Sequence, residues 1–118
     1  MIALTLPFPP SINHYWRHRR VGTGISTYIS YEGIQYRQIV ALEARKYESL
    51  GAARLSVQMW LHAPNKRKFD IDNRLKGLID SLTHAGVWHD DEQIDEIIVR
   101  RGAIQKNNGQ VKIIIEQI

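Results

Sequence analysis

The order of the predicted elements indicates an α+β fold, in which a βαβαββ-like mixed sheet packs against two helices. Three observations support this prediction. Two short alternating segments indicate strands in the first half of the chain, and one amphipathic pattern indicates a helix over 71–85. Two segments rich in β-branched residues end the chain. The length of 118 residues predicts one domain, 1–118, which can bury a hydrophobic core.

The first half of the chain is predicted to contain two strands with a helix between them. Residues 2–6 alternate apolar and polar side chains, and the prolines that follow end this strand. Residues 11–29 combine basic, aromatic, glycine and serine residues, so we expect a long loop there. Ser30 is the expected N-cap of a helix that runs to about Leu50. Residues 53–61 alternate again, which predicts a second strand.

The second half of the chain contains the helix with the strongest pattern. Its apolar residues recur three or four apart and form one stripe, which consists of Ile71, Leu75, Leu78, Ile79, Leu82 and Ala85. Asp70 is in position to cap the amino terminus of this helix. A turn is expected over 87–93. Strands are expected over 94–101 and 111–117, and the intervening KNNG predicts that these two strands pair as a hairpin.

The composition excludes several classes of protein and site. The chain contains no cysteine, which excludes disulfides and thiolate metal sites. The five histidines show no spacing typical of metal ligands, so a zinc site is not expected. The sequence shows neither a secretory signal nor an apolar run long enough to cross a membrane. We therefore expect a cytoplasmic protein without a membrane partner.

Charge is distributed unevenly along the chain. Residues 70–96 hold eight acidic and two basic residues, whereas the rest of the chain holds fourteen basic and four acidic ones. A basic protein with one acidic segment is typical of proteins that bind an anionic polymer and hold a cation against it. The alternative is that the basic residues only keep the protein soluble.

Carboxylates at two places in the acidic segment form a candidate metal site. Asp70 and Asp72 lie at the start of the predicted helix, and side chains two apart in an extended segment point the same way. Lys76 follows Asp72 by one helical turn. Asp90 or Asp91 joins them if the segment after the helix folds back. Three such carboxylates favour Mg²⁺ or Mn²⁺, ions that promote phosphodiester hydrolysis. Lys76 would then stabilise charge in the transition state.

Each of these residues also has a simpler interpretation. Asp70 is explained as an N-cap alone, and Asp72 as a favourable charge in the first turn of a helix. Asp90 and Asp91 are explained as solvated turn residues. His89 is either a surface residue or a group that assists the neighbouring carboxylates. The combination, beside a basic segment, favours the phosphodiesterase interpretation.

Two segments that mix cations with aromatic or polar side chains predict a nucleic-acid surface. Arginine and lysine bind phosphates, and aromatic rings stack on unpaired bases. The candidate DNA-binding residues are Asn13, His14, Tyr15, Trp16, Lys66, Arg67 and Lys68. The alternatives are that Tyr15 and Trp16 pack in the core or in an interface, and that the three cations belong to a solvated loop.

Two segments of the sequence resemble those of a known family. LPFPPSINHYWR near the amino terminus and NKRKFDIDNRLKGLIDSLTHAGVWHDDEQI in the centre are similar to the RusA-type Holliday junction resolvases, endodeoxyribonucleases common in prophages. The resemblance covers most of the chain. It implies a RusA-like α+β fold and a homodimer that uses Mg²⁺. It also implies symmetric paired nicks in four-way junction DNA during recombination and repair.

The same resemblance assigns roles to residues by position. It implies that Asp70, Asp72 and Asp91 are the metal-binding catalytic carboxylates and that Lys76 is an essential basic residue. Asp90 matches the acidic doublet and is expected to support the site. DNA contact is implied for Asn13–Trp16 and Lys66–Asn73. The competing hypotheses are a junction- or single-strand-DNA-binding protein without catalysis, and a metal-dependent ribonuclease.

Overall fold

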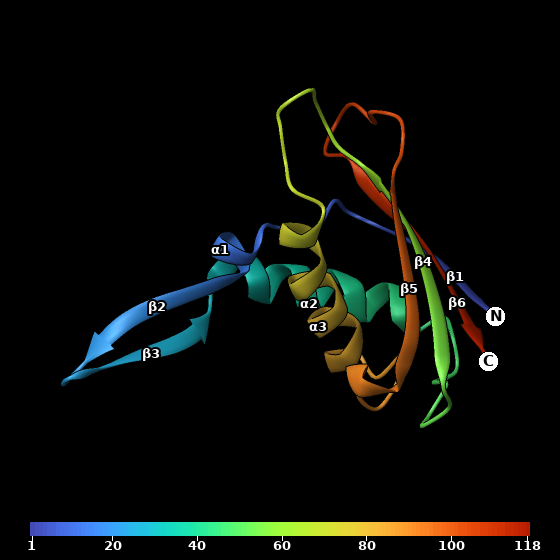
Figure 1. The fold of residues 1–118 in the computed structure, drawn as a ribbon, viewed down its shortest axis with the longest axis horizontal. Helices are drawn as coiled ribbons and strands as arrows, with labels where there is room; N and C mark the ends of the chain where they lie inside the picture. The colour runs from blue at the N-terminus through green and yellow to red at the C-terminus, as the bar shows by residue number, and fades with distance from the viewer.

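The centre of the molecule is a four-stranded mixed sheet with helices on one face. The computed structural model describes all 118 residues (Figure 1). The strand order is β1-β6-β4-β5. The strands are β1 (Ile2–Leu6), β4 (Leu55–His62), β5 (Ile94–Arg101) and β6 (Gln110–Gln117). β4 and β5 are parallel, whereas β6 is antiparallel to both β1 and β4. The predicted α+β fold class is confirmed.

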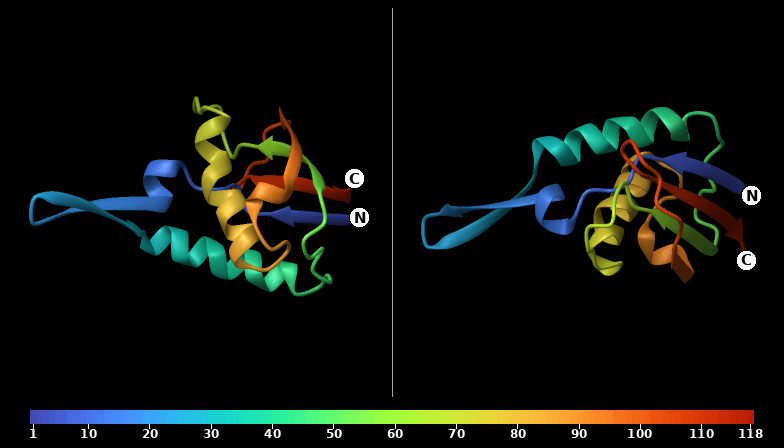
Figure 2. Two further views of the ribbon diagram at one scale, coloured as in Figure 1. Left: turned by 60° about the horizontal axis from the view of Figure 1, so that its bottom comes forward. Right: turned by 90° about the horizontal axis from the view of Figure 1, so that it is seen from above.

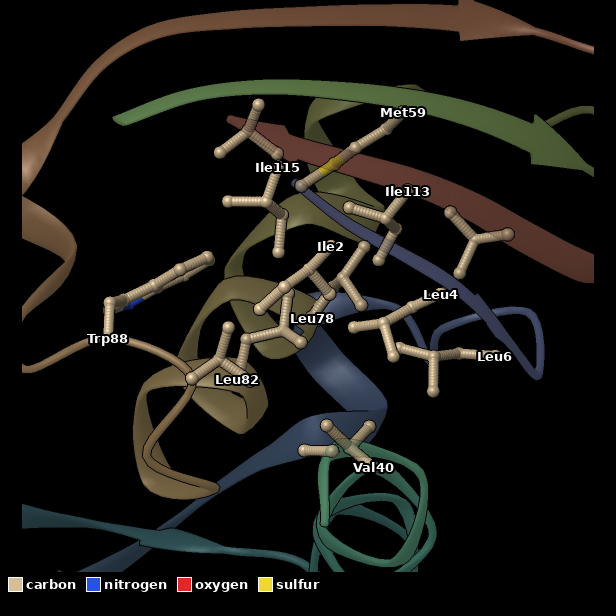
Figure 3. Close-up of a cluster of buried hydrophobic side chains, with 14 of the residues drawn as sticks. Ile2, Leu4, Leu6, Val40, Met59, Leu78, Leu82, Trp88, Ile113 and Ile115 are labelled. Atoms are coloured by element: carbon tan, nitrogen blue, oxygen red, sulfur yellow. The ribbon is translucent and has the colours of Figure 1, made fainter. Parts of the chain in front are cut away.

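Two helices cover the same face of this sheet, α2 (Tyr31–Ala44) and α3 (Leu75–His84). Every second residue of β1 and β4 is buried, as expected for strands with one face toward a core. The side chains in Figure 3 fill the space between the helices and the sheet. Leu78 and Leu82 of α3 are fully buried there, and burial of each side chain stabilises the fold by roughly 1.5–3 kcal/mol. The core therefore holds α3 rigidly against the strands.

α3 is the crossover helix between the two parallel strands, which require a connection of this kind. Leu55 of β4 is aligned with Ile94 of β5, and Leu61 with Arg101. The short 3₁₀ helix η1 (Asp72–Arg74) precedes α3, and a second one, η2 (Asp91–Gln93), precedes β5. Figure 1 shows η1 and η2 at opposite ends of α3. This placement decides the geometry of the candidate site.

The prediction of a long loop over 11–29 is wrong. This segment forms α1 (Ile12–Tyr15) and the hairpin of β2 (Trp16–Val21) and β3 (Gly24–Ile29). Gly22 has φ +60, a conformation that glycine adopts readily and that a tight two-residue hairpin turn requires. The hairpin forms a sheet of its own and projects from the body of the molecule (Figure 2). Because the hairpin buries neither face, its two strands carry no alternation of apolar residues that the sequence could show.

Two further boundaries differ from the prediction. Ser30 caps α2 as expected, accepting a hydrogen bond from the Gly33 amide at 3.0 Å, but α2 ends at Ala44 and not near Leu50. Asp70 is not an N-cap, because α3 begins after η1 with Arg74 at the cap position and no side-chain cap.

The prediction that the last two strands pair as a hairpin is also wrong. β4 lies between β5 and β6, so the two strands are not neighbours. The connection between them is bonded to β4 by Gly102 N–Leu61 O at 2.8 Å and Gln105 N–Ala63 O at 2.9 Å. Asn107 and Asn108 then turn the chain with φ of 67° and 84°. The KNNG signal identified a turn, but the turn brings the chain past the end of β4.

Candidate functional site

The loop between β4 and η1 forms a basic cavity that contains Asp70. The cavity has a volume of about 500 Å³, and its lining includes three consecutive cations, Lys66, Arg67 and Lys68, together with Asp70 and Arg101. Lys66, Arg67, Lys68 and Asp70 are all exposed. The cavity opens beyond the carboxyl ends of the parallel strands, the edge where α/β sheets usually bind ligands.

Arginines and phenylalanines hold this loop in place. Arg101 donates a hydrogen bond from Nη2 to the Phe69 carbonyl at 2.8 Å, and its guanidinium lies 4.3 Å from the Phe69 ring centre. The Phe8 ring meets Phe69 edge-on at 5.3 Å. Arg74 donates to the Pro9 carbonyl at 2.9 Å, and its guanidinium lies 5.0 Å from the Phe8 ring. These contacts fix the backbone next to Asp70.

Sequence reasoning missed Phe69, Arg74 and Arg101. Burial lowers the pKa of Arg74, and its buried Nε has no hydrogen-bond partner. Phe69 stands inside the quoted KRKFDID segment, between the cations and the first aspartate. An aromatic residue in such a basic segment is a signal for cation–π packing, and the cations that pack on Phe69 are Arg74 and Arg101.

Charged residues recur every four residues along η1 and α3, at Asp72, Lys76 and Asp80. Asp72 and Lys76 are exposed, whereas Asp80 is half-buried. Asp80 accepts two hydrogen bonds from Arg37, one from Nη2 at 2.7 Å and one from Nε at 3.2 Å, and a third from the Tyr15 hydroxyl. Arg37 therefore neutralises Asp80 and ties α2 to α3. The spacing of Asp80 from Lys76 is the signal that could have identified it.

Tyr15 packs in the interior of this structure. Its side chain is fully buried, and burial, followed by the hydrogen bond to Asp80, raises its pKa. Its ring lies on α3 at Gly77, where a Cβ would come within 2.8 Å of the ring. This burial favours the interior alternative for Tyr15, and its role in DNA binding stays a prediction. Of the other predicted DNA-binding residues in this segment, Asn13 and His14 are exposed and Trp16 is partly buried.

The acidic doublet lies at the other end of α3, in a rigid turn. Asp90 caps η2 by accepting a hydrogen bond from the Glu92 amide at 3.3 Å. The buried side chain of Gln93 accepts from the amides of His89 at 2.8 Å and Asp90 at 2.9 Å. Gln93 also donates to the carbonyls of Gly51 and Ala53, at 2.9 and 2.6 Å. Sequence reasoning missed Gln93, although an aspartate followed three residues later by a glutamine is a capping-box signature.

The two carboxyls of the doublet shift each other's pKa in opposite directions. A hydrogen bond from Asp91, followed by one from the Glu92 amide, lowers the pKa of Asp90. The same hydrogen bond, followed by burial and the negative charge of Asp90, raises the pKa of Asp91. Lys76 lowers the pKa of Asp91 and Asp80 raises it, so Asp91 lies within electrostatic reach of α3. Asp91 is thus the carboxyl that takes up a proton first.

The structure does not gather the predicted metal ligands within one chain. No group of three or more histidine, aspartate or glutamate side chains lies close enough together to hold a metal ion. A ten-residue helix is about 15 Å long, and α3 separates Asp70 and Asp72 at its start from Asp91 at its end. Mg²⁺ requires oxygens at about 2.0–2.1 Å. The carboxylates suit a hard cation chemically, but those of a single chain do not fit one three-carboxylate site.

Comparisons with known proteins cover nearly the whole chain. The family model described as endodeoxyribonuclease RusA matches residues 7–116. A protein of Enterobacteria phage HK97 named crossover junction endodeoxyribonuclease RusA is 43% identical over 115 residues, which cover 96% of this chain and 92% of the relative. The protein of the same name from Escherichia coli K12 is 35% identical over 118 residues, covering 98% and 94%. Another, from Enterobacteria phage 82, is 35% identical over 117 residues, covering 98% and 93%. No helix in the structure has the length and apolar character needed to span a membrane.

Proposed function

The chain belongs to the RusA family of endodeoxyribonucleases, and on this premise we propose that it resolves Holliday junctions. The activity is structure-specific hydrolysis of DNA by symmetric paired nicks, in recombination and repair. The observation that supports it most strongly is the match to crossover junction endodeoxyribonucleases over 92–94% of their length. The basic cavity around Asp70 supports the same function, because it brings a phosphate backbone to a carboxylate.

Nucleases of the RusA family depend on a metal ion. The proposed ion is Mg²⁺, with Mn²⁺ as a substitute, and the proposed ligands are Asp70, Asp72 and Asp91, with Asp90 supporting Asp91. When bound, such an ion polarises the phosphoryl group and activates water. Lys76 contributes an exposed positive charge in the first turn of α3, one turn after Asp72.

The proposed assembly is a homodimer with carboxylates of both chains in each site. Two symmetric nicks require two sites related by a two-fold axis, which a dimer provides. Within one chain α3 keeps Asp72 and Asp91 apart. Two chains can place the start of one α3 near the end of the other, so that each site takes Asp70 and Asp72 from one chain and Asp91 from its partner.

The proposed DNA surface begins at the cavity. Lys66, Arg67 and Lys68 are exposed and carry no acidic partner among the ion pairs of the structure, so their charges are free for phosphates. Asn13, His14 and Trp16 lie on and next to α1 and extend the surface. The protein acts on chromosomal or phage DNA in the cytoplasm under this proposal.

The test is incubation of the purified protein with an end-labelled four-way junction, with and without Mg²⁺. The expected result is a pair of nicks at symmetric positions that require the ion, and no cleavage of the matching linear duplex. An Asp72→Asn variant serves as the control for a contaminating nuclease. Junction binding without any nick in Mg²⁺ or Mn²⁺ would identify a non-catalytic binding protein, and equal cleavage of an RNA junction would identify a ribonuclease.

A further inference from the structure

The β2–β3 hairpin is the part of the chain that the catalytic proposal does not use. It is a two-stranded sheet that pairs only with itself and projects from the body (Figures 1 and 2). Nearly all of its residues are exposed between Trp16 and Ile29. An isolated hairpin is marginally stable in water, because it has no face to bury. An exposed hairpin of this kind is therefore suited to pack against a partner.

The base of the hairpin is fixed to the body. Ser30 donates a hydrogen bond from its amide to the Tyr15 carbonyl at 2.9 Å, which closes the two strands at their lower end. Tyr15 is buried against α3 and bonded to Asp80, while Trp16 meets the Tyr15 ring edge-on at 5.2 Å. The direction of the hairpin is thus set by α3, the helix that carries the proposed catalytic residues.

The charge of the hairpin identifies the chemistry of its partner. Residues 16–29 contain Arg17, Arg19 and Arg20, together with His18, and no acidic residue. None of the three arginines forms an ion pair in the structure. Three unpaired cations on a surface without acids favour a polyanion.

The two faces of the hairpin both carry cations. Arg17 and Arg19 lie on one face, where Arg19 stands 5.5 Å from the ring centre of Tyr28. Arg20 lies on the other face, with His18, which contacts the Thr27 hydroxyl at 3.0 Å. A cation on each face suits a ribbon that lies between two phosphate backbones. The turn adds no bulk, because Gly22, Thr23 and Gly24 are small.

We propose that the β2–β3 hairpin is an arm that enters a groove of duplex DNA next to the junction centre, with its arginines on the flanking phosphates. The major groove admits a two-stranded β-ribbon. Six residues of extended strand span about 20 Å, which corresponds to about six base pairs at a rise of 3.4 Å. The arm thus contacts the duplex portion of a junction, away from the proposed cleavage site. This inference rests on the proposed function for the identity of the DNA.

A second copy of the chain fits the arm less well than DNA. The exposed apolar residues Val21 and Ile25 lie on opposite faces of the ribbon, so they form no single apolar patch. Two arms of the same charge would also repel each other. A protein partner would have to bury the three arginines against its own acidic residues.

The test compares two double variants that remove the same charge. Arg17→Gln with Arg19→Gln changes the arm, and Arg45→Gln with Lys46→Gln changes the exposed carboxyl end of α2, far from the arm. Affinity for a four-way junction is measured from 50 to 200 mM salt without divalent ions, so the result does not depend on cleavage. The arm variant should lose about tenfold in affinity at 150 mM salt. The slope of the logarithm of the association constant against the logarithm of the salt concentration should be smaller in magnitude by about 1.8, because each of the two lost phosphate contacts contributes about 0.9.

A hydroxyl-radical footprint gives a second readout. The wild-type protein should protect several base pairs of duplex beyond the junction centre, and the arm variant should lose this outer protection while keeping the inner one. Circular dichroism melting checks that both variants stay folded.

An arm variant that matches the α2 variant in affinity, salt dependence and footprint would overturn the proposal. So would an arm variant that binds DNA normally but dissociates into monomers, and so would a wild-type protein that binds no DNA. A wild type that binds through the arm but never nicks would instead contradict only the proposed catalysis.

Discussion

The two ends of α3 present carboxylates in opposite electrostatic settings. At the start of the helix, Asp70 lies in the wall of a cavity with Lys66, Arg67, Lys68 and Arg101. At the end, Asp91 lies next to Asp90 and Glu92, and the negative charge of Asp90 helps to raise the pKa of Asp91. The first end attracts a phosphate backbone, and the second repels one unless a cation is present. We therefore propose that a phosphodiester approaches at the start of α3 and that the acidic end acts only together with a cation.

The two ends also differ in how they are held. Arginine–phenylalanine stacking fixes the loop at the start of α3, and its cations remain exposed. The acidic end is fixed by the buried amide of Gln93, which uses all its hydrogen-bonding capacity on backbone groups. The first arrangement leaves side chains free to adjust to DNA, whereas the second places Asp91 with little freedom.

Replacing the carboxylate at the basic end should have the largest effect. Asp70→Asn removes a negative ligand but keeps the shape and the surrounding cations, so the cleavage rate should fall about a thousandfold. Junction affinity should stay the same or rise, because a charge that repels phosphate is lost. Single-turnover cleavage and a binding titration measure the two quantities. Cleavage within tenfold of wild type would remove Asp70 from the catalytic set.

The rigidity of the acidic end is tested by Gln93→Ala. The variant leaves backbone groups of Gly51, Ala53, His89 and Asp90 unpaired, so the free energy of unfolding should fall by about 3 kcal/mol. Urea denaturation measures it. Gln105→Ala is the control, since that side chain is exposed and makes no hydrogen bond. Equal stability of the two variants would mean that η2 does not depend on this amide.

Lys76 lies in the first turn of α3 and is expected to act in the chemical step. Lys76→Ala should lower the cleavage rate about a hundredfold and change junction affinity less than twofold, because the transition state carries more charge than the bound DNA. Lys68→Ala, at the basic cavity, should show the reverse pattern, with affinity reduced more than rate. A loss confined to affinity in Lys76→Ala would make it an anchor for phosphate.

The smallest expected effect concerns the cation held at the acidic end. Arg54 is hydrogen-bonded to Asp95 and Glu92, and its bond to Asp95 lowers the pKa of that carboxyl. Because the pKa is lowered on folding, the interaction stabilises the protein above about pH 4 and is lost as the pH falls through the lower value.

The difference in melting temperature between wild type and Asp95→Asn should therefore be small at pH 7 and vanish near pH 3. Glu116→Gln removes an exposed acid outside this cluster and is the control. A difference that grows as the pH falls would show that Asp95 does not depend on Arg54.

The core of the fold followed from the sequence because burial imposes a period on it. The alternation in β1 and β4 and the stripe of α3 all identified buried faces correctly. The hairpin at 16–29 was missed because it buries neither face, so no apolar period marks it. The position of β4 between β5 and β6 is a long-range pairing, which a local turn signal such as KNNG does not determine.

The candidate site was predictable in its chemistry and not in its geometry. The residue types and spacing of Asp70, Asp72 and Lys76 indicated carboxylate and lysine chemistry at the start of a helix, and the structure places all three there. The expected return of Asp91 to this point depended on the path after α3. Asp91 precedes β5 and stays at the far end of α3, whereas Arg101, at the carboxyl end of β5, reaches the cavity with Asp70. The roles of these residues stay predictions until tested.

Mixing two inactive variants measures directly whether the two ends of α3 act together across two chains. Asp70→Asn and Asp91→Asn proteins are co-refolded so that mixed dimers form, and each is also assayed alone on a four-way junction with Mg²⁺. If Asp70 of one chain works with Asp91 of its partner, a mixed dimer retains one complete site, so the mixture nicks one strand while neither variant cleaves alone. Mixed dimers that form but leave the junction uncut would contradict this arrangement, because they would place all the catalytic carboxylates of a site within one chain.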